Sequence, residues 1–399
     1  MKIRSERIYT EKGCEAGVLT VENGVVTAFT PGAADPDAVD YGNQRIIPGI
    51  FDTHNHGTCG HSAGGTVGFT LEQDMANIKG YLKGLASQGT VNVFPTPLGT
   101  GGIAAVAAVM EEGPQDGASI LGIHSEGPWL NRVGEKGIRT GWPEVSVEAA
   151  KAMVEAGKGH LRLVALAPEI PGIQPVMDYF LSQGVTLAAA HSDNNYEQAA
   201  MAYARGVTVA THTGNVMTGM HHRDVGGLGA ALLNDGVECE VICDGLHVCN
   251  EMLKIYFRIK NPERFMMISD CTPLSGAPAG RYKGFDPGMD LNVTAEGFVL
   301  SDTGRLMGSS QPVLFDIGNL VNRVGVPLET CLMMACLNPA KKYGFADRKG
   351  SIAVGKDADF VVISDDYKAQ ATYAMGRKVY DRALEGEIFN AAYLKEAQG

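Results

Sequence analysis

The sequence lacks the features that would place the protein in a membrane or outside the cell. It contains no apolar run of about 18 residues, so we expect no membrane span. Its first residues, Met1–Glu6, include no apolar segment of the kind that forms the core of a signal peptide. None of the eight cysteines forms a CxxC pair, and we expect reduced, mostly buried thiols. These absences predict a cytoplasmic protein.

An excess of positive charge is also missing. The chain carries 33 lysines and arginines against 45 aspartates and glutamates, a formal net charge of -12. This balance argues against a nucleic-acid partner, because such binding depends on neutralising phosphates with basic side chains. It does not exclude a small anionic substrate, which one or two local cations can hold.

Both ends of the chain have the pattern of short strands joined by turns. Near the start, Val18–Phe29 contains two apolar segments around Asn23-Gly24, a pair of residues typical of hairpin turns. Near the end, Asp359–Ile363 is another apolar strand candidate. We therefore expect one small β-sandwich domain, formed by residues 1–48 and 345–399.

The residues between these ends, 49–344, alternate between strand and helix candidates. Eight apolar strands are predicted, at Gly49–His54, Val91–Thr96, Ile120–Glu126, Leu161–Pro168, Val185–His191, Val207–His212, Cys239–Gly245 and Phe265–Asp270. Helices are predicted in the gaps, at Leu71–Gln88, Gly102–Glu112, Val145–Ala156, Pro175–Gln183, Tyr196–Arg205 and Val248–Lys260, with a shorter one at Gly227–Asp235. Two more follow the last strand, at Val313–Val324 and Leu328–Tyr343. Eight such units predict an α/β fold, a (β/α)8 TIM-like barrel that forms the catalytic domain.

Side chains that can bind metals collect at the ends of the predicted strands. His54 and His56 share one face of the first strand, about 6–7 Å apart, and could hold one metal ion. Taken alone, two polar residues at a strand end would explain this pair equally well. Four further strands also end in ligand-type residues: Glu126, His191, His212 and Asp270. The carboxyl ends of the strands are where barrels of this class carry their active sites.

A divalent cation explains this pattern better than coincidence, because an unpaired charge at a buried strand end would be costly. Nitrogen and carboxylate ligands together suit zinc, iron, manganese or cobalt better than calcium or magnesium. Glu126 could bridge two ions. For Asp270 the alternative is a Ser-Asp helix cap, which the surrounding ligand-type residues disfavour.

Several of these residues stand in longer motifs. The segments are Pro48–Gly57, His124-Ser125-Glu126-Gly127-Pro128, Ala190-His191-Ser192-Asp193, His212–Asn215, His221-His222-Arg223-Asp224, Asp244-Gly245-Leu246-His247-Val248 and Ser269-Asp270. Over nearly its whole length the chain resembles the amidohydrolase superfamily and, within it, the N-acetylglucosamine-6-phosphate deacetylase family. The His-x-His motif is common to many amidohydrolases, whereas the Glu-Gly-Pro, His-His-Arg and Asp-Gly-Leu-His-Val combination is far more specific.

The resemblance implies a metal-dependent hydrolase of linear amides. By it, His54 and His56 bind one metal, His191 and His212 bind another, and Glu126 serves one or both. Zinc is the first expectation, with iron, manganese or cobalt as alternatives, and one or two ions per subunit. Asp270 takes a proton from the attacking water and passes it to the departing amine. The reaction converts N-acetylglucosamine 6-phosphate to glucosamine 6-phosphate and acetate.

The substrate side of the site follows from the same resemblance. Family residues that contact the sugar or the phosphate match Asn215, Val216, Arg223, His247, Leu306, Met307 and Gly308. In the family the arginine can come from the partner subunit, so a homodimer is expected. A bidentate guanidinium also suits a phosphate monoester on physical grounds.

The chain departs from the family pattern in ways that affect the sugar more than the reaction. Val216 is bulkier than the usual alanine, and Arg139 stands near the position of a substrate-contacting histidine. Arg139 could replace that histidine and add positive charge for the phosphate, or it could be a surface arginine. N-acetylgalactosamine 6-phosphate is therefore the alternative substrate. A cyclic-amide hydrolase is disfavoured because related enzymes of that kind usually carry a carboxylated lysine on the fourth strand, and Leu161–Ala167 has no lysine. A non-catalytic scaffold is disfavoured because all six ligand-type groups are present.

Overall fold

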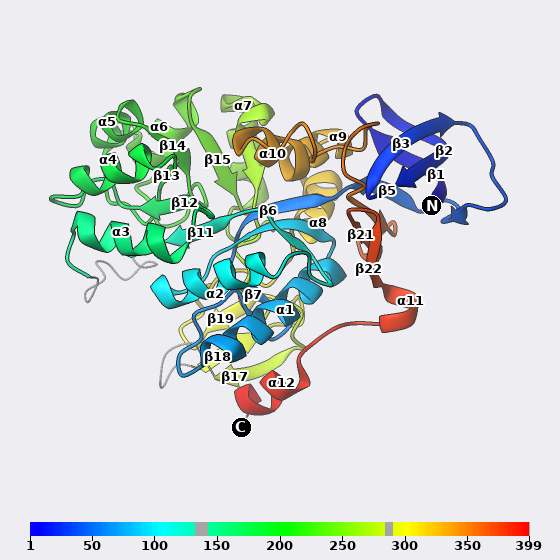
Figure 1. The fold of residues 1–399 in the computed structure, drawn as a ribbon. Coiled ribbons are helices and arrows are strands. Elements are labelled where there is room, and N and C mark those ends of the chain that lie inside the picture. Colours follow the sequence, from blue (N-terminus) through cyan, green and yellow to red (C-terminus); the bar gives the residue numbers. More distant parts are fainter. Residues whose placement is uncertain (132–142, 284–289, 399) are drawn as a thin grey trace.

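The computed structural model describes residues 1–131, 143–283 and 290–398 (Figure 1). Its central feature is a set of parallel strands, β6 (Ile50–Asn55), β9 (Thr90–Pro95), β10 (Ser119–Ile120), β11 (Ile123–Glu126), β12 (Leu161–Leu166), β13 (Thr186–Ala189), β14 (Val207–Ala210), β15 (Glu238–Val241) and β16 (Phe265–Met267). They pair in two sheets, in the orders β10-β9-β6 and β11-β12-β13-β14-β15-β16. All eight predicted strands are present, the third as the short pieces β10 and β11.

Helices connect these strands. They are α1 (Leu71–Ser87), α2 (Gly99–Glu111), α3 (Val147–Ala156), α4 (Gln174–Ser182), α5 (Tyr196–Ala204), α6 (Gly226–Leu233) and α7 (Asn250–Ile259). Side chains define where several of them begin. Thr70 caps α1 and Asn195 caps α5, each in a reciprocal capping box with a glutamine three residues later. After the last of these parallel strands, the chain forms the helices α8 (Val313–Asn319), α9 (Leu328–Leu332) and α10 (Asn338–Lys342). They alternate with π-helical turns at Leu320–Val324 and Met333–Leu337.

Successive residues of the parallel strands pack in two different cores. Val164 and Leu166 of β12 belong to the large core that also includes residues of the surrounding helices. Leu163 and Ala165, which point the other way, belong to a smaller core with Phe51, Phe94, Ala188, Ala190, Val209 and Met266. The strands are therefore buried on both faces, which explains why they appear in the sequence as continuous apolar runs.

The two ends of the chain meet in one sheet. The strands are β1 (Lys2–Thr10), β2 (Gly13–Glu22), β3 (Val25–Pro31), β4 (Val39–Asp40), β5 (Arg45–Pro48), β20 (Phe360–Ile363), β21 (Ala369–Ala374) and β22 (Arg377–Asp381). Their order is β22-β21-β20-β5-β1-β2-β3, with β4 beside β1. Strands from the two ends pair in this sheet, and the pairing gives one continuous sheet instead of the two separate sheets that a sandwich implies. The sheet is the upper right part of Figure 1, next to the start of β6.

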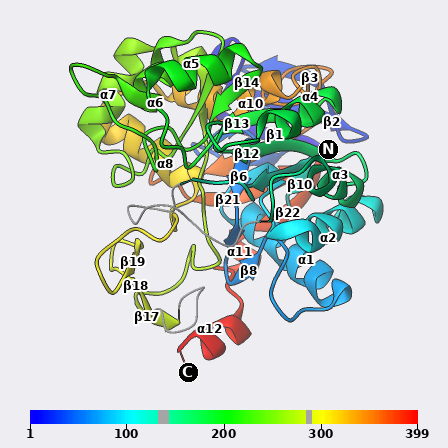
Figure 2. The same ribbon diagram turned by 90° about the vertical axis from the view of Figure 1, so that its left-hand side faces the viewer.

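One more antiparallel sheet follows β16 and was not predicted. It consists of β17 (Gly280–Lys283), β18 (Asp290–Val293) and β19 (Val299–Ser301). After the short helix α11 (Arg382–Glu385), the last helix α12 (Ala391–Gln398) lies beside this sheet, at the bottom of Figures 1 and 2. Its residues Tyr393 and Leu394 pack against Tyr282 and neighbouring apolar side chains. The end of the chain, assigned to the small domain from sequence, thus lies away from the terminal sheet.

No helix among the described residues is long and apolar enough to cross a membrane.

Candidate metal centre

The residues predicted to bind metal lie at the carboxyl ends of the parallel strands. His54 is in β6, His56 follows its last residue, and Glu126 is the last residue of β11. His191 and His212 each stand two residues beyond a strand, after β13 and β14, with φ angles of 46° and 30°. Asp270, three residues after β16, has a φ of 51°. Left-handed backbone at three non-glycine residues of one site is a strain that structures keep mainly at functional positions.

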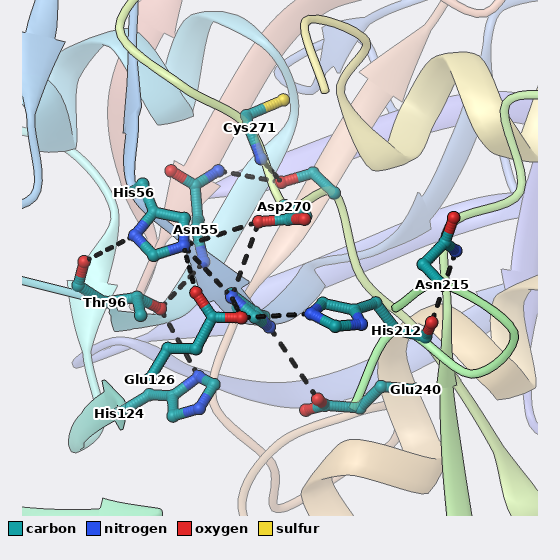
Figure 3. Close-up of polar contacts among 12 residues, drawn as sticks. Asn55, His56, Thr96, His124, Glu126, His212, Asn215, Glu240, Asp270 and Cys271 are labelled. Atoms are coloured by element: carbon teal, nitrogen blue, oxygen red, sulfur yellow. Dashed lines mark hydrogen bonds and ion pairs between the residues drawn. The ribbon is translucent and has the colours of Figure 1, made fainter. Parts of the chain in front are cut away.

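His54, His56 and Glu126 form one group of converging ligand atoms, and Figure 3 shows His56 and Glu126 facing each other. The Nε2 atoms of the two histidines are 3.2 Å apart. Glu126 Oε2 lies 3.1 Å from His56 Nε2, and Oε1 lies 3.7 Å from His54 Nε2. Nδ1 of His56 is 3.0 Å from the carbonyl oxygen of Thr96 and can donate to it. That hydrogen bond leaves the Nε2 lone pair of His56 free to bind a cation.

Glu126 forms a second group with His191 and His212. Its Oε1 lies 3.0 Å from the Nε2 atom of each histidine, and these two nitrogens are 3.2 Å apart. One carboxylate therefore belongs to both groups, with Oε1 facing His191 and His212 and Oε2 nearest to His56. This is the arrangement expected of a bridging ligand, and each group can hold one metal ion.

The carboxylates and histidines of the two groups stabilise each other's charged forms. Burial by itself would raise the pKa of Glu126, but His191 and His54 hold that pKa well below its usual range. Burial would likewise lower the pKa of His54, and the charges of Asp270 and Glu126 raise it well above the ordinary value. Carboxylates and imidazoles held this close, with several lone pairs pointing at one small volume, fit a divalent cation.

Asp270 faces the first of the two groups. Its Oδ1 lies 3.4 Å from the Nε2 atoms of both His54 and His56. The backbone fixes this residue on both sides, because its N–H donates to the carbonyl of His54 at 2.9 Å and its carbonyl accepts from Ser309 N–H at 2.9 Å. A carboxylate held here can exchange protons with a water or substrate between the ligands.

A buried polar network joins the ends of β6 and β16 behind these residues. Asp52 Oδ2 accepts from the Ser269 hydroxyl at 2.5 Å and from Asn55 Nδ2 at 3.1 Å. Asn55 Nδ2 also donates to Ser269 Oγ at 2.9 Å. Burial raises the pKa of Asp52 to about 6, although the Ser269 and Asn55 hydrogen bonds oppose that shift. The network sets the spacing between the His-x-His segment and Asp270.

Among the predicted substrate contacts, His247 and Asn215 are fixed by hydrogen bonds. Nδ1 of His247 is 2.6 Å from Asp244 Oδ2, so the other ring nitrogen remains for a substrate. Burial would lower the pKa of His247, but Asp244 raises it. The Asn215 side chain donates to the carbonyl of His212 at 3.2 Å. Asn215 therefore stands directly beside a predicted metal ligand.

The structure describes all of the other predicted substrate contacts except Arg139. Val216 has a φ of 50° and its carbonyl accepts from Ser192 N–H at 3.1 Å. Leu306, Met307 and Gly308 are half-buried. A Cβ on Gly308 would lie 2.4 Å from Thr272 Cγ2 and 3.4 Å from the Asp270 carbonyl, so only glycine fits beside the Asp270 backbone. Arg223 is exposed and contacts His222, with 2.7 Å between Nη1 and Nε2. Arg139 lies outside the described residues.

Sequence reasoning missed one carboxylate near the site. Glu240, in β15, is fully buried and its Oε2 lies 3.9 Å from His54 Nδ1. The one available signal was an acidic residue within a predicted barrel strand, because barrel strands are buried on both faces and such a residue then needs a partner inside the protein.

Comparison with known proteins identifies the class. Residues 45–381 match the amidohydrolase family. The chain belongs to this family, as its motifs predicted.

Within the family the chain is similar to amino-sugar phosphate deacetylases. It is 32% identical to the N-acetylglucosamine-6-phosphate deacetylase of Vibrio furnissii, over 95% of each chain. It is 28% identical to the N-acetylgalactosamine-6-phosphate deacetylase of Escherichia coli O157:H7, over 94% of this chain and 98% of the relative. A mutant N-acetyl-D-glucosamine-6-phosphate deacetylase of Mycobacterium smegmatis, solved in complex with N-acetyl-D-glucosamine-6-phosphate, superposes with a TM-score of 0.81 at 26% identity, covering 95% of this chain and 99% of that one.

Proposed function

We propose that the protein hydrolyses the N-acetyl group of N-acetylglucosamine 6-phosphate, releasing acetate and glucosamine 6-phosphate. The observation that carries the proposal is the meeting of His54, His56, His191 and His212 around Glu126, with Asp270 at their edge. Family membership and the deacetylases of similar sequence support the same reaction.

The four histidines and Glu126 would hold the metal. We infer one ion between His54, His56 and Glu126 and a second between Glu126, His191 and His212, with zinc as the first candidate. Such an ion would polarise the amide carbonyl and lower the pKa of a nearby water.

Asp270 would carry the proton through the reaction. Its carboxylate takes a proton from the attacking water while the new C–O bond forms. It then returns the proton to the nitrogen as the C–N bond breaks, so that the amine leaves in neutral form. The fixed backbone of Asp270, bonded to His54 and Ser309, keeps the carboxylate in place for both steps.

The remaining residues would position the sugar phosphate. The ring nitrogen of His247 that does not contact Asp244 is available to the amide or to a sugar hydroxyl. Asn215 and Val216 lie beside the ligand His212, and Leu306, Met307 and Gly308 would line the sugar pocket. Arg223 projects from an exposed loop, where it could reach a phosphate in the partner subunit of a homodimer.

We also infer that the two parallel sheets form one closed barrel. The hydrogen bond from Asp270 N–H to the His54 carbonyl joins the segments that end β16 and β6. The inner core that Phe51 and Phe94 of one sheet share with Leu163 and Met266 of the other supports this arrangement. The division into a catalytic domain and a small domain from both chain ends, and a cytoplasmic location, remain part of the proposal.

The test is acetate release from a panel of N-acetylated sugars with zinc, iron, manganese or cobalt present. We expect fast release from N-acetylglucosamine 6-phosphate and slow release from unphosphorylated N-acetylglucosamine. A preference for N-acetylgalactosamine 6-phosphate would favour the alternative substrate, to which the similarity to the Escherichia coli enzyme also points. No release from any phosphorylated sugar with any metal would refute the proposal.

A further inference from the structure

Glu240 is a buried carboxylate with one satisfied oxygen and one unsatisfied oxygen. It lies in β15 and its side chain is fully buried. The hydroxyl of Thr53 donates to Oε1 at 2.8 Å, but Oε2 has no hydrogen-bond partner. Within the described part of the chain, neither lysine nor arginine pairs with this carboxylate, and its ion pair is with His54. A buried negative charge in this position needs a positive charge nearby.

The complementary donor is the inner nitrogen of His54. Nδ1 of His54 is also buried without a hydrogen-bond partner, and Glu240 Oε2 lies 3.9 Å from it. The mode for an N–H···O hydrogen bond is about 2.9–3.0 Å, so a movement of roughly 1 Å would join the two atoms. An unsatisfied donor and an unsatisfied acceptor thus face each other across a short gap inside the protein.

The other histidine of the pair shows what such a contact does. Nδ1 of His56 is already 3.0 Å from a backbone carbonyl oxygen, that of Thr96. Histidines that bind metals almost always donate their second ring nitrogen to a carbonyl or carboxylate, which fixes the tautomer and raises the basicity of the binding nitrogen. His54 has no carbonyl at Nδ1, but it has Glu240.

We propose that Glu240 is a positioning residue for the metal centre. It accepts the Nδ1 proton of His54, fixes the tautomer in which the Nε2 lone pair faces the metal, and adds negative charge behind the His54–His56 side. A cation bound at Nε2 balances the buried charge of Glu240. Glu240 therefore sets the metal affinity of the His54–His56 group and has no direct part at His191 and His212. This inference rests on the proposed metal-dependent function.

The test measures zinc bound per chain at graded, buffered free zinc concentrations. The variant His54→Ala first shows which of the bound zinc ions depends on His54. Glu240→Gln should weaken the binding of that ion by roughly 10–100-fold, the usual effect of removing an outer partner of a ligand. The ion held by His191 and His212 should keep its affinity. Glu240→Asp keeps a carboxylate and should restore part of the lost affinity.

Glu238→Gln is the matched control. It makes the same chemical change in the same strand, but Glu238 pairs with Arg264 at 2.9 Å and Lys342 at 2.5 Å instead of a histidine. It should leave both zinc affinities unchanged.

Three results would overturn the inference while the proposed function stands. They are wild-type zinc affinity in Glu240→Gln, an equal loss of affinity in Glu238→Gln, and full zinc content in His54→Ala. A wild-type protein that binds no metal would refute the proposed function itself.

Discussion

Two clusters of buried charge among the described residues differ in whether the chain itself supplies a partner for every charge. At the junction of the small sheet with the parallel strands, Lys349 Nζ lies 2.7 Å from Asp359 Oδ2 and 3.0 Å from Asp357 Oδ2. Arg348 donates to the other oxygen of Asp357, and Asn92 of β9 donates to Asp359 at 3.2 Å. Every charge in this junction cluster has a partner from the chain itself.

The candidate metal centre is built differently. Around Glu126, four histidine nitrogens converge with their lone pairs, and Asp270 adds a second carboxylate without a lysine or arginine partner among the described residues. The shortest distances in this centre join atoms that could bind the same metal ion. In the junction cluster they join a lysine or arginine to an aspartate. A cluster that the chain completes acts on stability, whereas a cluster left for a ligand acts on function. The predictions below break each cluster in turn.

The largest effect is expected from Glu126→Gln, because Glu126 belongs to both ligand groups. Loss of its charge should remove most bound metal and reduce turnover by roughly 10⁴-fold or more, since metal polarisation contributes several kcal/mol and each 1.36 kcal/mol is tenfold in rate. Metal analysis and acetate release measure the two effects. Glu111→Gln, which alters an exposed ion pair with Lys158, is the control and should change neither. Full metal content with normal turnover would show that Glu126 is not shared.

Asp270→Asn should affect chemistry more than metal binding. The change keeps the size of the side chain and removes the proton carrier, so kcat should fall by about 10²–10⁴-fold. Metal content should stay close to that of wild type, because four histidines and Glu126 remain. Steady-state kinetics and metal analysis of the same sample separate the two. Normal turnover would assign the proton transfer to another group.

The two clusters also differ in how much of them the sequence could predict. The residues that we propose as metal ligands could be predicted because each follows an apolar run, and the barrel pattern places all strand ends on one side. The left-handed backbone of His191, His212 and Asp270 leaves no such pattern, because no glycine marks these positions.

Glu240 was missed because the contacts that explain it are distant in the chain. Glu238 and Glu240 alternate with Cys239 and Val241, the pattern of a strand with one face in solvent. The second face of this strand is inside the protein, and the partner Thr53 lies 187 residues earlier. The position of α12 beside β17 depends on distant contacts in the same way, and local periodicity did not predict it.

In the junction cluster, Lys349→Met should reduce stability and leave the turnover of folded protein unchanged. Removing the cation leaves Asp359 buried without its counterion, a change that costs about 3–5 kcal/mol when one partner of a buried pair is lost. Urea unfolding measures this free energy. Lys158→Met breaks an ion pair whose side chains are both 51% exposed and should cost less than about 1 kcal/mol. Equal losses of unfolding free energy in the two variants would show that the buried pairs of the junction cluster contribute no more than an exposed pair.

The same lysine gives a smaller, pH-dependent effect. Burial would lower the pKa of Lys349, but Asp359 and Asp357 raise it above its ordinary value of 10.5. The folded state therefore holds this proton more tightly than the unfolded state. Its contribution to stability is complete below pH 10.5 and declines as the pH rises through the folded pKa. The difference in unfolding free energy between wild type and Lys349→Met should thus shrink from pH 9 to pH 11. A constant difference would contradict the raised pKa.

The smallest expected effect concerns the proposed phosphate contact, Arg223. Its guanidinium is exposed and contacts His222, so Arg223→Ala should leave folding and metal content unchanged. If the arginine binds phosphate, KM for N-acetylglucosamine 6-phosphate should rise by roughly tenfold with little change in kcat, as expected for an interaction equal in ground and transition states. Turnover of unphosphorylated N-acetylglucosamine should not change. Arg205→Ala, which removes an exposed arginine paired with Asp178, controls for general loss of positive charge. Equal losses on both substrates would contradict a phosphate role for Arg223, and the phosphate would then need another cation.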